Sequence, residues 1–166
     1  MAPLPFFYAL SVWLHLVSLT LWIGAISFFL FVFGPAVRSM SPGEGVRILD
    51  QGRQSLQTLS WIAINLLILT GVLNLVLRGI SGDLGKTYYS ILAVKLFFFL
   101  AMFFHHSLQA FKYAPQIATL TAQATPEIQD WPEPLLSHWK KWFMLLKINA
   151  TLGAIALLFG IGLARS

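Results

Sequence analysis

Polar residues are distributed very unevenly along the chain. Four segments, at about 5–37, 56–78, 88–112 and 139–164, are almost entirely apolar. Each reaches or exceeds the roughly 20 residues that a helix needs to cross a hydrocarbon core about 30 Å thick. Backbone groups inside lipid must bond within their own segment, so the four segments predict membrane helices rather than strands. We therefore predict an all-α protein, an integral membrane four-helix bundle that forms one domain over 1–166.

The composition supports a membrane protein and excludes several other classes. Hydrophobic residues make up 57% of the chain and charged residues 10%, whereas soluble domains are about 25% charged. This excludes a soluble globular domain, a disordered chain and a nucleic-acid-binding module. There is no cysteine, which excludes disulfides, iron–sulfur clusters and thiolate metal sites. The first apolar segment is too long for the hydrophobic region of a signal peptide, so we expect it to remain as a span.

Basic residues predict the orientation of the bundle. Six of them lie in the connections 38–55 and 112–141, namely Arg38, Arg47, Arg53, Lys112, Lys140 and Lys141. Three lie on the opposite side, namely Arg78, Lys86 and Arg165. The positive-inside rule then places the two connections in the cytoplasm and both termini in the periplasm. Three tryptophans, Trp131, Trp139 and Trp142, would mark the cytoplasmic interface of the fourth helix.

All six acidic residues are predicted to lie in loops, namely Glu44, Asp50, Asp83, Glu127, Asp130 and Glu133. A bundle without intramembrane carboxylates does not suit an ion-driven pump, which needs them. It also excludes paired-carboxylate catalysis and carboxylate-bridged metals. The polar side chains left inside the predicted spans are mostly nitrogen donors: His15, Asn65, Asn74, Lys95, His105, His106, Lys147 and Asn149.

The first helix carries a histidine within a heptad of large residues. Tyr8, His15, Trp22 and Phe29 recur every seven residues and share one face. This face predicts that His15 is an axial ligand of haem or a metal inside the bundle, with Trp22 packed beside it. The alternative is a neutral histidine that hydrogen-bonds to a neighbouring helix.

On the third helix, Lys95, Met102 and His106 share a face, and His105 points about 100° away. His15 lies about 15 Å and Lys95 about 10 Å from the same face of the membrane, whereas His105 and His106 lie about 25 Å in. Two axial ligands of one haem need similar depth, which favours His15 with Lys95. The alternative is that the long Lys95 side chain reaches toward the interface. A second, cytoplasmic-side site from His105, His106 and His138 is a further alternative.

Copper is the other candidate metal. Met102, His105 and His106 form an M-x-x-H-H pattern, and thioether with imidazole suits copper. The alternative is that Met102 only fills the core.

Two stripes predict bundle-facing helix surfaces. One lies on the fourth helix and consists of Asn149, Gly153, Ala156 and Gly160, with Lys147 on the opposite side. The other lies on the second helix and consists of Arg53, Gln57, Ser60, Ile64, Leu67, Gly71, Asn74 and Arg78.

Three motifs resemble a known family. The pattern W-L-H-L-x-x-x-x-L-W-I-G from Trp13 to Gly24 resembles the first helix of CopD-type copper-resistance membrane proteins. The pattern V-K-L followed by His105 and His106 resembles their third helix and that of the related HemJ-type protoporphyrinogen oxidases. The segment L-K-I-N-A-T-L-G from Leu146 to Gly153 is closer to CopD, because the HemJ-type F-N-E-x-P element is absent.

The resemblance implies both a cofactor and a location. HemJ-type proteins are thought to hold haem b through a first-helix histidine and a third-helix lysine, which correspond to His15 and Lys95. The CopD resemblance implies copper uptake or supply to periplasmic copper proteins. Both families imply a bacterial cytoplasmic membrane.

Three hypotheses follow. The first is a haem b protein for redox chemistry or electron transfer, with His15, Lys95, Trp22 and His106 around the cofactor and a quinone or a periplasmic redox protein as partner. If it is an enzyme, it is a haem-dependent membrane oxidoreductase, whose catalytic residues the sequence does not identify. The second is copper import or copper supply through His15, Met102, His105 and His106. The third is a structural subunit of an oligomer or a larger membrane complex.

Overall fold

The computed structural model describes residues 3–81, 85–125 and 127–165, and every regular element in this part of the chain is helical. In chain order the elements are α1 (Pro3–Phe28), the π-helix η1 (Phe29–Phe33), α2 (Gly34–Val37), α3 (Pro42–Ser81), α4 (Lys86–Ser107), the π-helix η2 (Leu108–Tyr113), α5 (Ala114–Gln123) and α6 (Glu133–Arg165). They form four rods, because α1, η1 and α2 are continuous, and so are α4, η2 and α5. The predicted all-α four-helix bundle is confirmed, and all four rods are long and apolar enough to cross a membrane.

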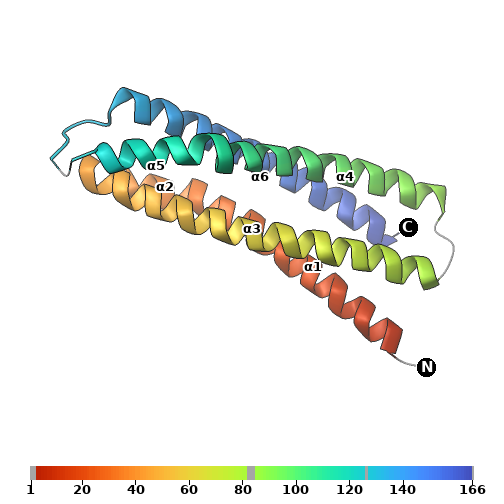
Figure 1. Ribbon diagram of the computed structural model, residues 1–166. Coiled ribbons are helices and arrows are strands. Elements are labelled where there is room, and N and C mark those ends of the chain that lie inside the picture. The colour runs from red at the N-terminus through yellow and green to blue at the C-terminus, as the bar shows by residue number, and fades with distance from the viewer. Residues whose placement is uncertain (1–2, 82–84, 126, 166) are drawn as a thin grey trace.

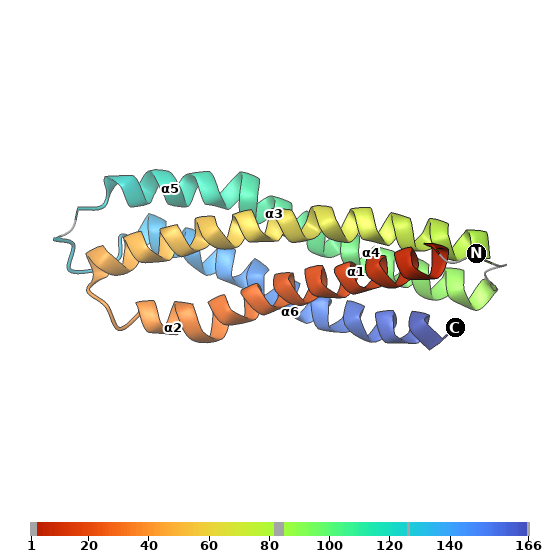
Figure 2. The same ribbon diagram turned by 90° about the horizontal axis from the view of Figure 1, so that it is seen from below.

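The four rods lie along one another in an elongated bundle (Figures 1 and 2). Both termini lie at one end, which we call the termini end. The connections from α2 to α3 and from α5 to α6 lie at the other end, which we call the loop end. The closest pairs of rods are α1 with α3 and α4 with α6. The bundle is therefore two helix pairs set against each other.

The helices extend further at the loop end than the sequence predicted. Helix α3 has 40 residues and begins at Pro42, so the expected connection over 38–55 is wrong. The segment Ser41-Pro42-Gly43-Glu44 explains this start: the Ser41 hydroxyl donates to the Glu44 carboxylate at 2.8 Å, and proline suits the first helical turn. At about 60 Å, α3 is about twice as long as the hydrocarbon core is thick.

The connection expected over 112–141 is also mostly helical, because the chain continues through Pro115 into α5. Proline lacks an N–H and clashes with the carbonyl four residues earlier. A wider π turn precedes each internal proline: η1 ends just before Gly34-Pro35 and η2 just before Ala114-Pro115. In η1 the Gly34 N–H donates to the carbonyl of Phe29, five residues back. The two π turns therefore let the rods pass these prolines without breaking.

The prediction that all the acidic residues lie in loops is wrong. Glu44 and Asp50 lie within α3, and Glu133 begins α6. Asp50 is also buried. Among the described residues, the connection between α5 and α6 holds Glu127 and Asp130, and Asp83 lies outside the described residues.

The apolar core fills the loop end of the bundle. Its buried members extend from Val37 and Val46 to Trp22, Leu67 and Met102, and the partly buried Leu19, Phe99 and Leu152 pack against them. Trp139 and Trp142 are buried in it and pack against Phe29 and Phe143, so the expectation that they mark the membrane interface is wrong. Trp131 is only half-buried.

Candidate functional site

His15 lies beyond the apolar core, on the side of α1 that faces α3. Its Nδ1 is 2.8 Å from the hydroxyl oxygen of Thr70. That hydroxyl donates its own hydrogen to the carbonyl of Leu66 at 2.6 Å, so it accepts the hydrogen of His15 Nδ1. This assigns the Nδ1–H tautomer to a neutral His15 and leaves Nε2 as the ring nitrogen that a metal can take.

Two small neighbours complete the surroundings of the His15 ring. Ser11 donates to the backbone carbonyl of Thr70 at 3.4 Å, which ties α1 to α3 one turn away from the histidine. Gly71 lies under the ring, where an added Cβ would be 3.5 Å from the His15 Cε1. The histidine thus hydrogen-bonds to a neighbouring helix, as one sequence alternative expected, and retains one nitrogen for a ligand.

Lys95 lies on the other helix pair. It is half-buried on α4, and its Nζ is 3.7 Å from the position that a Cβ on Gly160 of α6 would take. The side chain therefore extends along α6 rather than straight into lipid. The two residues that the sequence paired by depth thus lie on different helix pairs, His15 against α3 and Lys95 against α6.

Trp22 and His106 lie together in the core, on the loop-end side of His15. Trp22 is fully buried, and its ring meets the His106 ring edge-on at 6.2 Å. Trp61 of α3 lies closer to His106, at 4.9 Å between ring centroids. Trp22 thus packs on His106, and His106 belongs to an aromatic cluster rather than to the surroundings of Lys95.

The residues of the copper hypothesis are not gathered at one point. Met102 is buried with its methyl group near Gly153 of α6. His105 Nδ1 is 2.6 Å from the Ala101 carbonyl of its own helix, and His138 is bonded in the same way to Pro134. Within the described residues, no three His, Cys, Asp or Glu side chains are close enough together to hold a metal ion.

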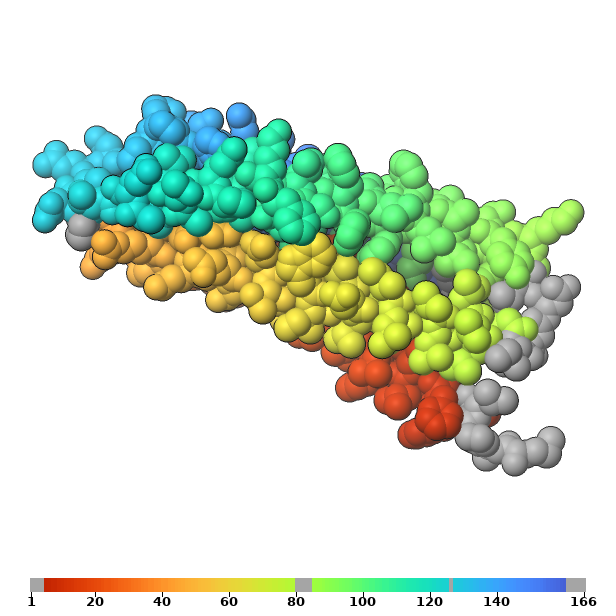
Figure 3. Space-filling model, viewed as in Figure 1, coloured from red at the N-terminus to blue at the C-terminus, as the bar shows by residue number. Residues whose placement is uncertain are grey.

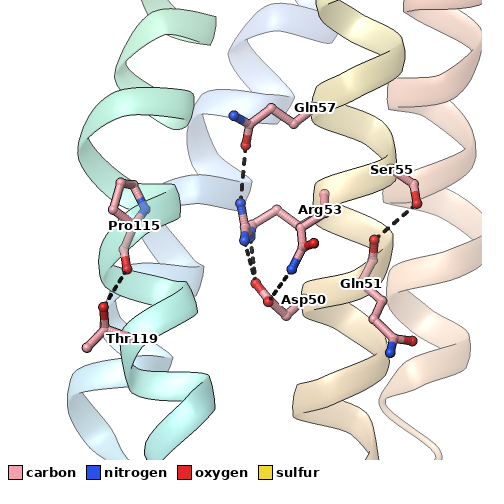
Figure 4. A network of polar contacts seen from close by, with 8 residues as sticks. Asp50, Gln51, Arg53, Ser55, Gln57, Pro115 and Thr119 are labelled. Atoms are coloured by element: carbon pink, nitrogen blue, oxygen red, sulfur yellow. Dashed lines mark hydrogen bonds and ion pairs between the residues drawn. The ribbon is translucent and has the colours of Figure 1, made fainter.

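The predicted inward stripe of α3 begins with Arg53 and Gln57, and the structure adds an ion pair with Asp50 that was not foreseen from the sequence. Arg53 forms an ion pair with Asp50 at 2.7 Å and donates to Gln57 at 3.2 Å. Gln54 donates to the second oxygen of Asp50. Figure 4 shows these side chains on the side of α3 that faces α5, across from Pro115. Their spacing of three and four residues is the available sequence signal, since such residues are neighbours on a helix.

Comparisons with known proteins add no assignment: no family model matches the chain, and no curated protein or solved structure shows significant similarity to it.

Proposed function

We propose that this chain is a haem b protein of the CopD- and HemJ-like superfamily, with His15 and Lys95 as axial ligands, that carries out electron transfer or redox chemistry in the membrane. The observation that supports this best is the hydrogen bond from His15 to Thr70. Histidines that bind metals almost always donate their other ring hydrogen to a fixed partner, which sets the ring orientation.

The donor set suits haem iron. One imidazole nitrogen from α1 and one amine from α4 approach from different helix pairs, which is how a macrocycle held between helices is ligated. Next to Lys95, Phe98 of α4 stacks on Phe159 of α6 with centroids 5.7 Å apart, which supplies flat apolar surface for a porphyrin.

Each side chain has a defined role in this proposal. Thr70 orients His15, and Gly71 leaves the imidazole room against α3. The haem would supply reversible one-electron chemistry. Because the site lies within the spans, its redox partner is a membrane carrier such as a quinone or a periplasmic protein that docks at the nearer face.

The visible absorption spectrum of the purified protein tests the proposal. After expression with haem supply, the wild-type protein should show a Soret band that His15→Ala removes. His105→Ala is the matched control, because His105 is bonded to its own helix, and it should keep the band. A colourless wild-type protein, or equal loss in both variants, would contradict haem ligation by His15.

Measurement of the copper content of the same sample distinguishes the copper hypothesis from haem binding. One tightly bound copper per chain without a Soret band would favour the copper hypothesis. The geometry supports copper less, because Met102 is packed against Gly153 in the core and no three His, Cys, Asp or Glu side chains of the described residues are close enough together to hold a metal ion.

A further inference from the structure

The His106 ring is buried in the middle of the bundle with one nitrogen unsatisfied. The residue is 5% exposed, and its Nε2 has no hydrogen-bond partner among the described residues. A buried polar atom without a partner costs about 1–3 kcal/mol, so native proteins satisfy most such atoms with protein groups or water.

A small cavity of about 10 Å³ lies at His106. Its polar lining comes from two of the four rods: Gln57 and Ser60 lie on α3, and His106 and Gln109 lie on the rod formed by α4, η2 and α5. Gln109 already donates to the Trp142 carbonyl at 3.0 Å, which leaves its amide oxygen facing Asn149 at 3.5 Å. A cavity of this size with two to four polar partners is what a single buried water requires.

The cavity adjoins a groove on the surface of the bundle. The groove has a volume of about 400 Å³ and lies between α3 and the η2–α5 rod, with Arg53, Gln54 and Thr58 on its α3 side and Pro115 and Ala118 opposite. Gln57 and Ala110 line both the groove and the cavity. Figure 3 shows the face on which α3 and α5 lie side by side. Gln57 and Ala110 therefore lie between the His106 cavity and the groove.

We propose that the cavity beside His106 is a water-binding site that fills from the groove between α3 and α5 past Gln57, so that water and protons reach His106 from the loop end. The water would donate to or accept from Nε2 of His106 and bond to the Ser60 hydroxyl and the Gln57 amide. The Asp50–Arg53 ion pair lies at the groove and keeps its wall polar without adding net charge. The site is complete without any cofactor.

Hydroxyl-radical footprinting with X-ray pulses tests this site, because radicals made from bound water oxidise the side chains beside it. Trp142 lines the cavity and Trp139 does not, yet both are almost fully buried, at 3% and 2% exposure. In the full-length protein in detergent or nanodiscs, we expect Trp142 and His106 to be oxidised several-fold faster than Trp139. Equal slow rates for Trp142 and Trp139 would overturn the proposal.

Two variants test the route of entry. Ala110→Val narrows the passage and Gln57→Leu makes its α3 wall apolar, and each should lower oxidation of Trp142 and His106 while Trp139 is unchanged. Trp139 serves as the internal control, because a rise in its oxidation rate would reveal general unfolding of the variant. If both variants fold and leave the labelling of Trp142 at the wild-type rate, water does not enter past Gln57.

Discussion

Individual polar side chains in this bundle form hydrogen bonds and ion pairs with residues on their own helix or on the adjacent helix. The Thr70 hydroxyl donates its hydrogen bond to the Leu66 carbonyl and therefore accepts one from His15. Arg53 is held by Asp50 and Gln57, and its charge is neutralised where it is buried. Lipid and apolar side chains offer no replacement hydrogen bonds. Removal of Thr70 should therefore weaken the site at His15, and removal of Arg53 should lower the free energy of unfolding.

Thr70→Val keeps the shape of the side chain but removes the hydroxyl that orients His15. We expect haem affinity to fall by about 10–100-fold, the usual cost of losing such a partner. Haem titration of the apoprotein measures the change. Thr151→Val is the control, because Thr151 is exposed and bonds only to the Lys147 carbonyl of its own helix. Equal haem affinities for the Thr70 variant and the wild type would mean that Thr70 does not orient His15 for haem binding.

Arg53→Met leaves Asp50 buried and unpaired. Breaking a buried ion pair from one side typically costs about 3–5 kcal/mol in unfolding free energy. We expect such a loss in denaturant unfolding in detergent, and recovery of most of it in the double variant Asp50→Leu, Arg53→Met. Arg47→Met provides the exposed control and should be close to neutral. A single variant as stable as the wild type would mean that the pair contributes nothing.

At the scale of elements, the π turns η1 and η2 allow two rods to continue through Pro35 and Pro115. Rod α1–η1–α2 also packs closely on α3: the Phe33 ring of η1 lies directly over Gly52, where a Cβ would overlap it. By contrast, nothing lies within 4 Å of a Cβ added at Gly24 of α1. Gly52 is therefore required for close packing of η1 on α3, whereas Gly24 lies at an open position on the outer face of α1.

Gly52→Ala should displace Phe33 from α3 and destabilise the bundle by about 1–3 kcal/mol, as overpacking does. Gly24→Ala should be neutral or stabilising by up to about 1 kcal/mol, because alanine favours helix. Both values come from unfolding in the same detergent. Phe33→Leu in the Gly52→Ala background should restore stability, and a lack of rescue would mean that the clash is not the cause.

Sequence periodicity predicted the helices and their inward faces, but it did not predict the hydrogen-bond partners of the candidate site residues. The stripe on α3 is turned inward as expected: Ser60, Ile64 and Leu67 are buried, and so are Asn149, Gly153 and Ala156 on α6. The helix starts were missed because charged residues near Pro42 and Glu133 resemble loop residues. Thr70 was missed because a threonine in an apolar span has no distinctive pattern, and its role depends on a contact 55 residues away.

At the scale of the whole molecule, the two helix pairs meet through a filled core at the loop end, while His15 and Lys95 lie beyond that core. The loop end also carries most of the exposed basic residues, namely Arg38, Arg47, Lys112, Lys140 and Lys141. Arg53 does not add to this surface charge, because it is buried with Asp50. From the positive-inside rule we predict that the loop end lies in the cytoplasm.

Cysteine labelling in intact cells tests this topology, because the chain has no cysteine of its own. Cysteines introduced next to both termini should react with an impermeant maleimide added outside. Gln129→Cys, in the connection between α5 and α6, should react only after the membrane is opened. Termini on opposite sides would contradict the four-span arrangement, and a reactive Gln129→Cys with protected termini would invert the orientation.

Near-infrared magnetic circular dichroism of the oxidised protein reports the axial ligands of a haem directly. Ligation by His15 and Lys95 predicts a low-spin haem with the charge-transfer band of imidazole–amine ligation. Lys95→Met should replace that band with the band of imidazole–thioether ligation or with a high-spin spectrum. A bis-imidazole band in the wild-type protein, or a band that Lys95→Met leaves unchanged, would contradict ligation by His15 and Lys95.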